Sequence, residues 1–144
     1  MSPQTAARYM RVVGLFSIII SVPFAFAGVS DFTGANDVFF GLVSSGTEGV
    51  AGFNTLEAKL AVAIAGGLFG GLMAMYLFIS APGVEQGNSL IRKGTIYTFL
   101  TWFAIDSAAS VASGNAPNVI ANLGFLIVLL APLFLVKPAA DTTA

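Results

Sequence analysis

Neither cysteine nor histidine occurs among the 144 residues of this sequence. Without cysteine the chain has no disulfide, no thiolate metal site and no iron–sulfur cluster. Without histidine it lacks the commonest haem and zinc ligand, the usual general base and the Ser-His catalytic triad. We therefore expect no cofactor, no metal site and no conventional enzyme active site in this protein.

Charged residues are also scarce, at 9% of the chain, whereas soluble domains carry about 25%. Hydrophobic residues make up 56%, and the net charge of −1 leaves no basic patch for binding nucleic acid. This composition predicts one integral membrane domain over residues 1–144, with the lipid bilayer as its first partner.

Four apolar segments predict an all-α fold, a bundle of four transmembrane helices. Their expected ranges are 9–27, 55–80, 94–113 and 117–136, with short polar tails at either end of the chain. The first segment resembles a secretory signal because Ala25-Phe26-Ala27 has the pattern of a cleavage site. We interpret it as a retained membrane helix.

Two connections separate the first three segments. Residues 28–54 are rich in Gly, Ser, Asn and Asp and predict a long extracytoplasmic loop. Within it, Asp37–Val43 predicts a single helical turn. We expect its Phe39, Phe40 and Leu42 to rest on the helix ends or to enter the membrane interface. The alternative is that this loop forms a lid over a substrate site. Residues 81–93 predict a polar loop that turns at Pro82-Gly83.

The distribution of basic residues predicts the orientation. Of the six basic residues, five fall on one side of a four-span chain, and only Lys59 falls on the other. The five are Arg8, Arg11, Arg92, Lys93 and Lys137. Because positively charged loops stay in the cytoplasm, we expect a multi-pass protein of a bacterial inner membrane with both termini cytoplasmic.

The second segment carries small residues at a spacing of four, after a helix start resembling a capping box at Asn54-x-x-Glu57. One row contains Gly66, Gly70 and Ala74, and the neighbouring row contains Ala63, Gly67 and Gly71. Such rows let another helix backbone approach closely. We expect the partner helix to belong to the same chain, with a second copy as the alternative.

Asp106 is the one ionisable residue expected deep in an apolar segment. The next break, Ser113–Pro117, predicts a tight turn between antiparallel helices, with Gly114 at positive φ and Asn115 as helix cap. Helical spacing puts Trp102, Asp106, Ser110 and Ser113 on one face before the turn, and Asn118 and Asn122 on one face after it. We expect Asp106 to bond Asn122 or Ser110 across the hairpin; a ligand, ion or proton site is the alternative.

These patterns favour a non-enzymatic accessory or assembly subunit of a larger membrane complex, or a homo-oligomer. The alternative is a small transporter, channel or hydrophobic-ligand-binding protein that uses a polar pocket of Trp102, Asp106, Ser110, Asn118 and Asn122. A membrane-embedded enzyme would need Glu57 as a second carboxylate beside Asp106, and nothing in the sequence fixes their separation.

Overall fold

The computed structural model describes residues 1–46 and 49–137. The expected polar tail at 138–144, the far end of the expected domain and Glu48 of the long loop lie outside the described residues. Helices make up the described fold, which has no strand in these residues. In chain order they are α1 (Pro3–Ala25), α2 (Ala35–Val43), the 3₁₀-helix η1 (Gly49–Gly52), α3 (Leu56–Met75), the π-helix η2 (Tyr76–Ser80), α4 (Ala81–Glu85), α5 (Ser89–Ala112) and α6 (Asn118–Leu135).

The all-α class is confirmed, and three helices in the described residues are long and apolar enough to cross a membrane. They are Pro3–Ala25, the continuous run Leu56–Glu85, and Asn118–Leu135. Helix α5 is not among them, although it has 24 residues. It carries Arg92, Lys93 and Asp106. The fourth span therefore stays a prediction.

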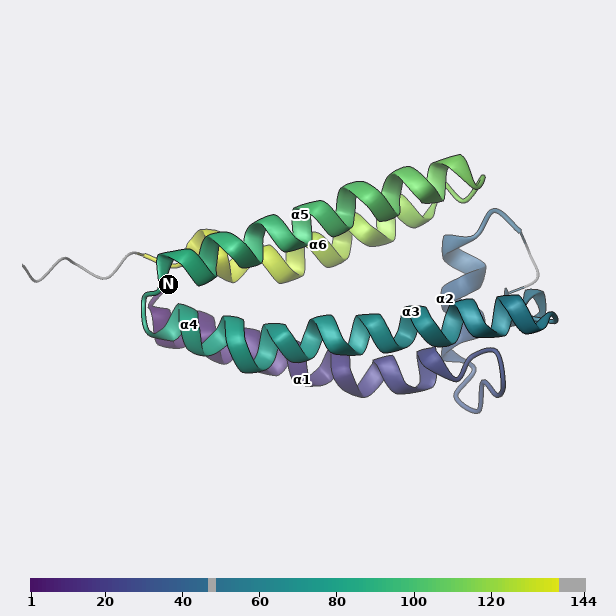
Figure 1. The fold of residues 1–144 in the computed structure, drawn as a ribbon, viewed down its shortest axis with the longest axis horizontal. Helices are drawn as coiled ribbons and strands as arrows, with labels where there is room; N and C mark the ends of the chain where they lie inside the picture. Colours follow the sequence, from purple (N-terminus) through teal and green to yellow (C-terminus); the bar gives the residue numbers. More distant parts are fainter. Residues whose placement is uncertain (47–48, 138–144) are drawn as a thin grey trace, which may run out of the picture.

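The helices form two pairs (Figure 1). In one pair, α1 packs against the continuous run that contains α3 and α4. In the other pair, α5 packs against α6. The pairs meet at the end that holds the N-terminus and α4, here called the N-terminal end. They diverge toward the opposite end, where α2 lies across them, here called the α2 end. The hydrophobic core therefore gathers at the N-terminal end, around the fully buried Met10, Met73, Tyr76 and Phe99.

Glycines bring α1 and α3 together. A Cβ added at Gly66 would lie 2.4 Å from Cα of Ala25, and one added at Gly70 would lie 2.7 Å from Oγ of Ser21. The Gly66–Gly70 row therefore faces α1 of the same chain. On the neighbouring row, a Cβ added at Gly67 or Gly71 would meet no atom within 4 Å.

The expected polar tail at residues 1–8 is wrong, because α1 begins at Pro3. The hydroxyl of Ser2 accepts a hydrogen bond from the Thr5 N–H at 3.2 Å, and Pro3 occupies a first-turn position where its missing N–H is not needed. Ala6 and Ala7 are completely buried in the core. Contacts of these two buried residues therefore stabilise helix in the residues that precede the apolar segment.

The expected turn at Pro82-Gly83 is also wrong. The helix passes through the π turn Tyr76–Ser80 and continues to Glu85, so the connection to α5 shrinks to residues 86–88. Gly83 is buried against Ile91, where an added Cβ would lie 2.6 Å from side-chain atoms. Tertiary contact therefore holds as helix a segment whose composition predicts a loop.

Two further local expectations need correction. Residues 35–43 form nine residues of helix α2 rather than a single turn, and Leu42 is 72% exposed while Phe39 and Phe40 are half-buried. Helix α3 is capped by Thr55, whose side chain accepts from the Ala58 N–H at 3.1 Å, and not by an Asn54 capping box. The hydroxyl of Thr55, one residue after Asn54, thus takes the N-cap position.

Candidate functional site

The turn between α5 and α6 fixes which residues of the two helices face each other. Gly114 has a φ of +82°, and the Asn115 N–H donates to the Ser110 carbonyl at 2.7 Å, which ends α5. The sequence predicts Asn115 as the cap of α6, but Asn115 does not occupy that position. Its side-chain amide instead donates to the Ser113 hydroxyl at 3.2 Å, and its oxygen accepts from the Ser45 N–H at 3.2 Å.

Asp106 lies at the centre of a hydrogen-bonded network across this hairpin. Its Oδ1 accepts from the amide of Asn122 at 2.8 Å, the amide of Asn118 at 3.0 Å and the hydroxyl of Ser110 at 3.3 Å. Asn118 also donates to the Ser110 hydroxyl at 2.8 Å. The interhelical bonds expected for Asp106 are therefore present, and four of the five candidate residues lie together.

Ser107 belongs to this network although sequence reasoning missed it. It is buried, and its hydroxyl accepts from the Asn122 amide at 3.3 Å. Ser107 lies beside the stripe that contains Asp106, so helical periodicity alone does not select it. Counting outward from the hairpin turn puts it level with Asn122, and this register was the signal that could have found it.

Trp102 is the candidate residue outside the network. It is half-buried and packs against the hydrophobic core. In the part of the chain that the structure describes, no hydrogen bond joins it to Asp106. Ser113, at the other end of the stripe, turns back onto its own helix and donates to the Ser110 carbonyl at 3.0 Å. The polar stripe is therefore shorter than the sequence predicts.

The second carboxylate oxygen of Asp106, Oδ2, has no hydrogen-bond partner among the described residues, because all three donors point at Oδ1. No buried side-chain nitrogen or oxygen in the described chain lacks a partner. Since Asp106 is half-buried, Oδ2 must lie on the accessible side of the network. The site thus presents one carboxyl oxygen, Oδ2, without a hydrogen-bond partner in the described structure.

Metal chemistry finds no support around this carboxylate. The described residues contain no group of three or more His, Cys, Asp or Glu side chains that would hold a metal ion. The one ion pair in residues 1–46 and 49–137 joins Arg11 to Glu85, at the N-terminal end. Asp106 therefore has neither a second carboxylate nor a basic side chain bonded to it in the described structure.

Helix α2 connects the two helix pairs at the α2 end. The Asn36 amide donates to the Pro23 carbonyl of α1 at 3.0 Å, and Ser45, just after α2, bonds both Gly114 and Asn115 of the hairpin turn. Phe40 stacks on Phe24 of α1 with ring centroids 5.4 Å apart. The connection is thus a structured bridge between the pairs, and the lid alternative stays untested.

Asp31 organises the start of α2. Partial burial opposes ionisation of Asp31, but hydrogen bonds from the N–H groups of Asp37 and Asn36, the Asn36 amide and the Thr33 hydroxyl outweigh it. The pKa of the Asp31 carboxyl is therefore lowered from its ordinary value. Negative charge near a helix N-terminus is also favourable, so ionised Asp31 stabilises this end of α2.

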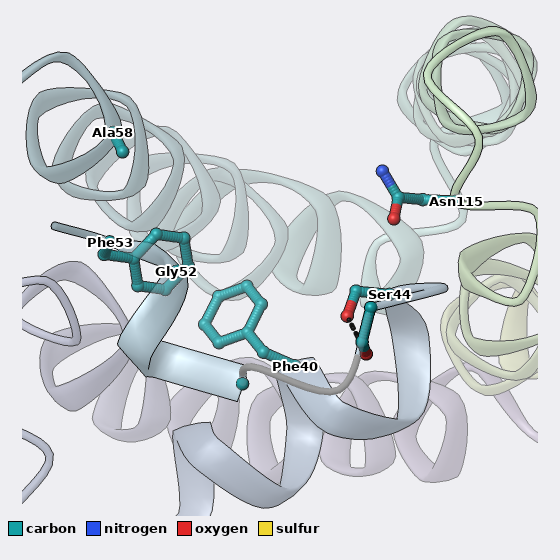
Figure 2. A pocket seen from close by; sticks show the side chains of 8 residues that line it. Phe40, Ser44, Gly52, Phe53, Ala58 and Asn115 are labelled. Atoms are coloured by element: carbon teal, nitrogen blue, oxygen red, sulfur yellow. Dashed lines mark hydrogen bonds between the residues drawn. The ribbon is translucent and has the colours of Figure 1, made fainter. Parts of the chain in front are cut away.

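A shallow pocket of about 510 Å³ opens at the α2 end (Figure 2). Phe40 and Phe53 form its apolar wall, and Ala58 of α3, Ser44 and Asn115 also line it. Among the described lining residues none has an ionisable side chain, and none of the residues bonded to Asp106 lines the pocket. The described part of the lining therefore offers mainly hydrophobic contact.

Comparison with known proteins identifies no relative: no protein-family model, no curated protein and no solved structure matches this chain.

Proposed function

We propose that the chain is a four-span protein of a bacterial inner membrane, with α5 as the fourth span and both termini in the cytoplasm. The 24 residues of α5 extend about 36 Å at about 1.5 Å per residue, which exceeds the roughly 30 Å hydrocarbon core. Arg92 and Lys93 lie in its first turns, where long basic side chains reach the interface. Oδ1 of Asp106 accepts hydrogen bonds from Asn118 and Asn122 of α6, which offsets part of the cost of a carboxyl group within a span.

The cysteine-free chain allows a direct test of this topology with single-cysteine variants. Gln86 lies in the short α4–α5 connection, and Ala116 lies in the α5–α6 turn; both are exposed. In intact spheroplasts, a membrane-impermeant maleimide should label Ala116→Cys, and it should label Gln86→Cys only after permeabilisation. Labelling of both positions from the same side would show that α5 does not cross the membrane.

Within the membrane we propose a non-enzymatic role as an assembly subunit that associates with a second copy of itself. The observation that carries this proposal is the open row of Ala63, Gly67 and Gly71 on α3. A Cβ added at either of these glycines would meet nothing within 4 Å, whereas the parallel row is filled by α1. In lipid, small residues spaced by four promote helix association because the backbones approach closely.

A second copy is the occupant that fits this row most simply. A two-fold axis places the same patch on both subunits, so a flat row of small residues is complementary to itself. The row spans two helical turns and carries no charge that would repel its copy. A different chain of a larger membrane complex could instead occupy the same face. In that case the purified protein would be a monomer.

The test replaces Gly67 and Gly71 together by leucine and uses Gly124→Leu as matched control. Gly124 on α6 is also exposed and also has nothing within 4 Å of an added Cβ, so Gly124→Leu makes one such Gly→Leu change on another helix. Light scattering in detergent should show a dimer for the wild type and the control, and a monomer for the double variant. A monomeric wild type, or a dimeric double variant, would refute self-association.

A second function, that of a small transporter, channel or hydrophobic-ligand-binding protein that uses Asp106, is supported by the Oδ2 atom, which has no hydrogen-bond partner among the described residues. The polar side chains of this network bond one another directly. A ligand would therefore contact the accessible face of the network rather than enter it. Saturable quenching or shift of Trp102 emission by an amphiphile would support this function, because Trp102 is the single tryptophan and lies one turn from Asp106.

A further inference from the structure

We propose that Asp106 binds the ammonium group of an amphiphilic primary amine, with Oδ2 as the acceptor. This inference rests on the second function proposed above and names its ligand class. The shared chemistry is a primary ammonium on a hydrophobic chain. Its source is either the headgroup of an aminophospholipid or a free long-chain amine.

The donor arrangement around Asp106 fits a charged carboxylate. Both amide groups, of Asn118 and Asn122, donate to Oδ1, as does the hydroxyl of Ser110. Each of these bonds treats Asp106 as an acceptor, and an ionised carboxylate offers acceptors only. Hydrogen bonds to an ionised oxygen are stronger than those to a neutral one. The network therefore occupies one carboxylate oxygen and leaves the other without a partner among the described residues.

Among the described residues, no ion pair joins Asp106 to a basic side chain. Arg11 pairs with Glu85, and the Arg92 Nε donates to the Leu133 carbonyl at 2.7 Å, both at the N-terminal end. Lys59 lies at the α2 end, where its Cα and the base of its side chain pack against Gly28. A second copy brings only the same residues at the same depths. An ammonium from outside the chain would supply the positive charge that no described ion pair supplies to Asp106.

A primary ammonium fits the free oxygen better than a metal ion does. Hard metal ions require about six or more oxygen ligands, whereas Asp106 offers one free carboxylate oxygen and no second carboxylate joins it in the described structure. An ammonium has three donors and no acceptor. It would donate to Oδ2 and find further acceptors in the amide oxygens of Asn118 and Asn122.

The surroundings suit a cation that is attached to a hydrocarbon chain. Trp102 precedes Asp106 by one turn on the same face of α5, and an indole face attracts cations. Ile105, beside Asp106, is 67% exposed and offers apolar contact. At the depth of Asp106 a small hydrated amine would lose its water, whereas an amphiphile already places its headgroup and chain across such a boundary.

The experiment follows Trp102 emission in the purified full-length protein in a neutral detergent at pH 7. Dodecylamine is cationic at this pH, since alkylamines titrate near 10.4 as lysine does, and dodecanol is its neutral match. We expect dodecylamine to bind at least about 10-fold more tightly than dodecanol, because it alone pairs with a poorly solvated carboxylate. Dodecyltrimethylammonium, which has the charge but no N–H donor, should bind more weakly than dodecylamine.

Two variants isolate the carboxylate. Asp106→Asn keeps a hydrogen-bonding side chain of the same shape and should lose the preference for the amine over the alcohol. Glu57→Gln removes an equal charge from the exposed start of α3 and should keep the preference. The comparison of the three amphiphiles on the wild type does not depend on how Asp106→Asn folds. The inference therefore stays testable if that variant unfolds.

The source of the amine is assigned in lipid nanodiscs. In phosphatidylglycerol discs dodecylamine should shift Trp102 emission. If equimolar phosphatidylethanolamine suppresses that shift, the lipid headgroup is the ligand; if it does not, a free amine is the ligand. Equal binding of dodecylamine and dodecanol would overturn the ammonium inference and leave hydrophobic-ligand binding standing. No response of Trp102 to any amphiphile would overturn both.

Discussion

Gly66 and Gly67 are neighbours in the same helix, yet alanine substitutions should affect them in opposite directions. At Gly66 the new Cβ would lie 2.4 Å from Cα and 2.6 Å from the backbone nitrogen of Ala25. Backbone atoms of a packed helix have no rotamer through which to move away. Gly66→Ala must therefore push α1 and α3 apart. At Gly67 the Cβ would meet no atom within 4 Å.

The magnitudes follow from these contacts. Overpacking of this kind costs about 1–3 kcal/mol, and alanine recovers up to about 1 kcal/mol of helix propensity relative to glycine. We expect Gly66→Ala to lower the free energy of unfolding by up to about 2 kcal/mol net. Gly67→Ala should range from neutral to about 1 kcal/mol more stable, since only the propensity term applies there.

The assay is reversible unfolding in mixed micelles of dodecyl maltoside and sodium dodecyl sulfate, followed by far-ultraviolet circular dichroism. Each variant serves as the control of the other, because the chemical change and the helix are the same. Alanine still satisfies a small-residue row, so any self-association through Gly67 should persist in both samples. Equal stability of the two variants would refute the close α1–α3 contact at Gly66.

Three further perturbations test other parts of the structure. Tyr76→Phe removes the buried hydrogen bond from the Tyr76 hydroxyl to the Leu129 carbonyl, 2.7 Å long, and should cost about 0.5–1.5 kcal/mol in the same unfolding assay. Asp31 has a lowered pKa in the folded state, so its stabilising effect is present above its unfolded pKa and lost as the pH falls through the folded one. The protection factors of the α2 amides, taken relative to the intrinsic exchange rate at each pH, should fall below about pH 4 in the wild type, and Asp31→Asn should remove that acid dependence. Asn115→Ala removes the acceptor of the Ser45 N–H, so exchange at Ser45 should rise while global stability stays unchanged.

The hairpin around Asp106 shows how much of a site can be read from sequence. Glycine at 114 sets the turn, the turn sets the register, and the 3.6-residue period sets the faces. These are local rules, and together they bring Asp106 to Ser110, Asn118 and Asn122. Trp102 obeys the same period but packs against the hydrophobic core. Helical periodicity gives the direction of a side chain around the helix, and it does not give the neighbour found there.

The sequence by itself determined the helical class and the apolar stretches, because hydrophobicity and helical period are properties of each segment alone. Only the tertiary structure decided between the two glycine rows of α3, since Gly66–Gly70 and Gly67–Gly71 have the same spacing and composition. It also decided that helix continues through Pro82 and Gly83, where packing against Ile91 outweighs the tendency of these residues to turn. The physical reason is the same in both cases. Free energy from contacts between segments distant in the chain exceeds local preference, and no local pattern records which segment will be the neighbour.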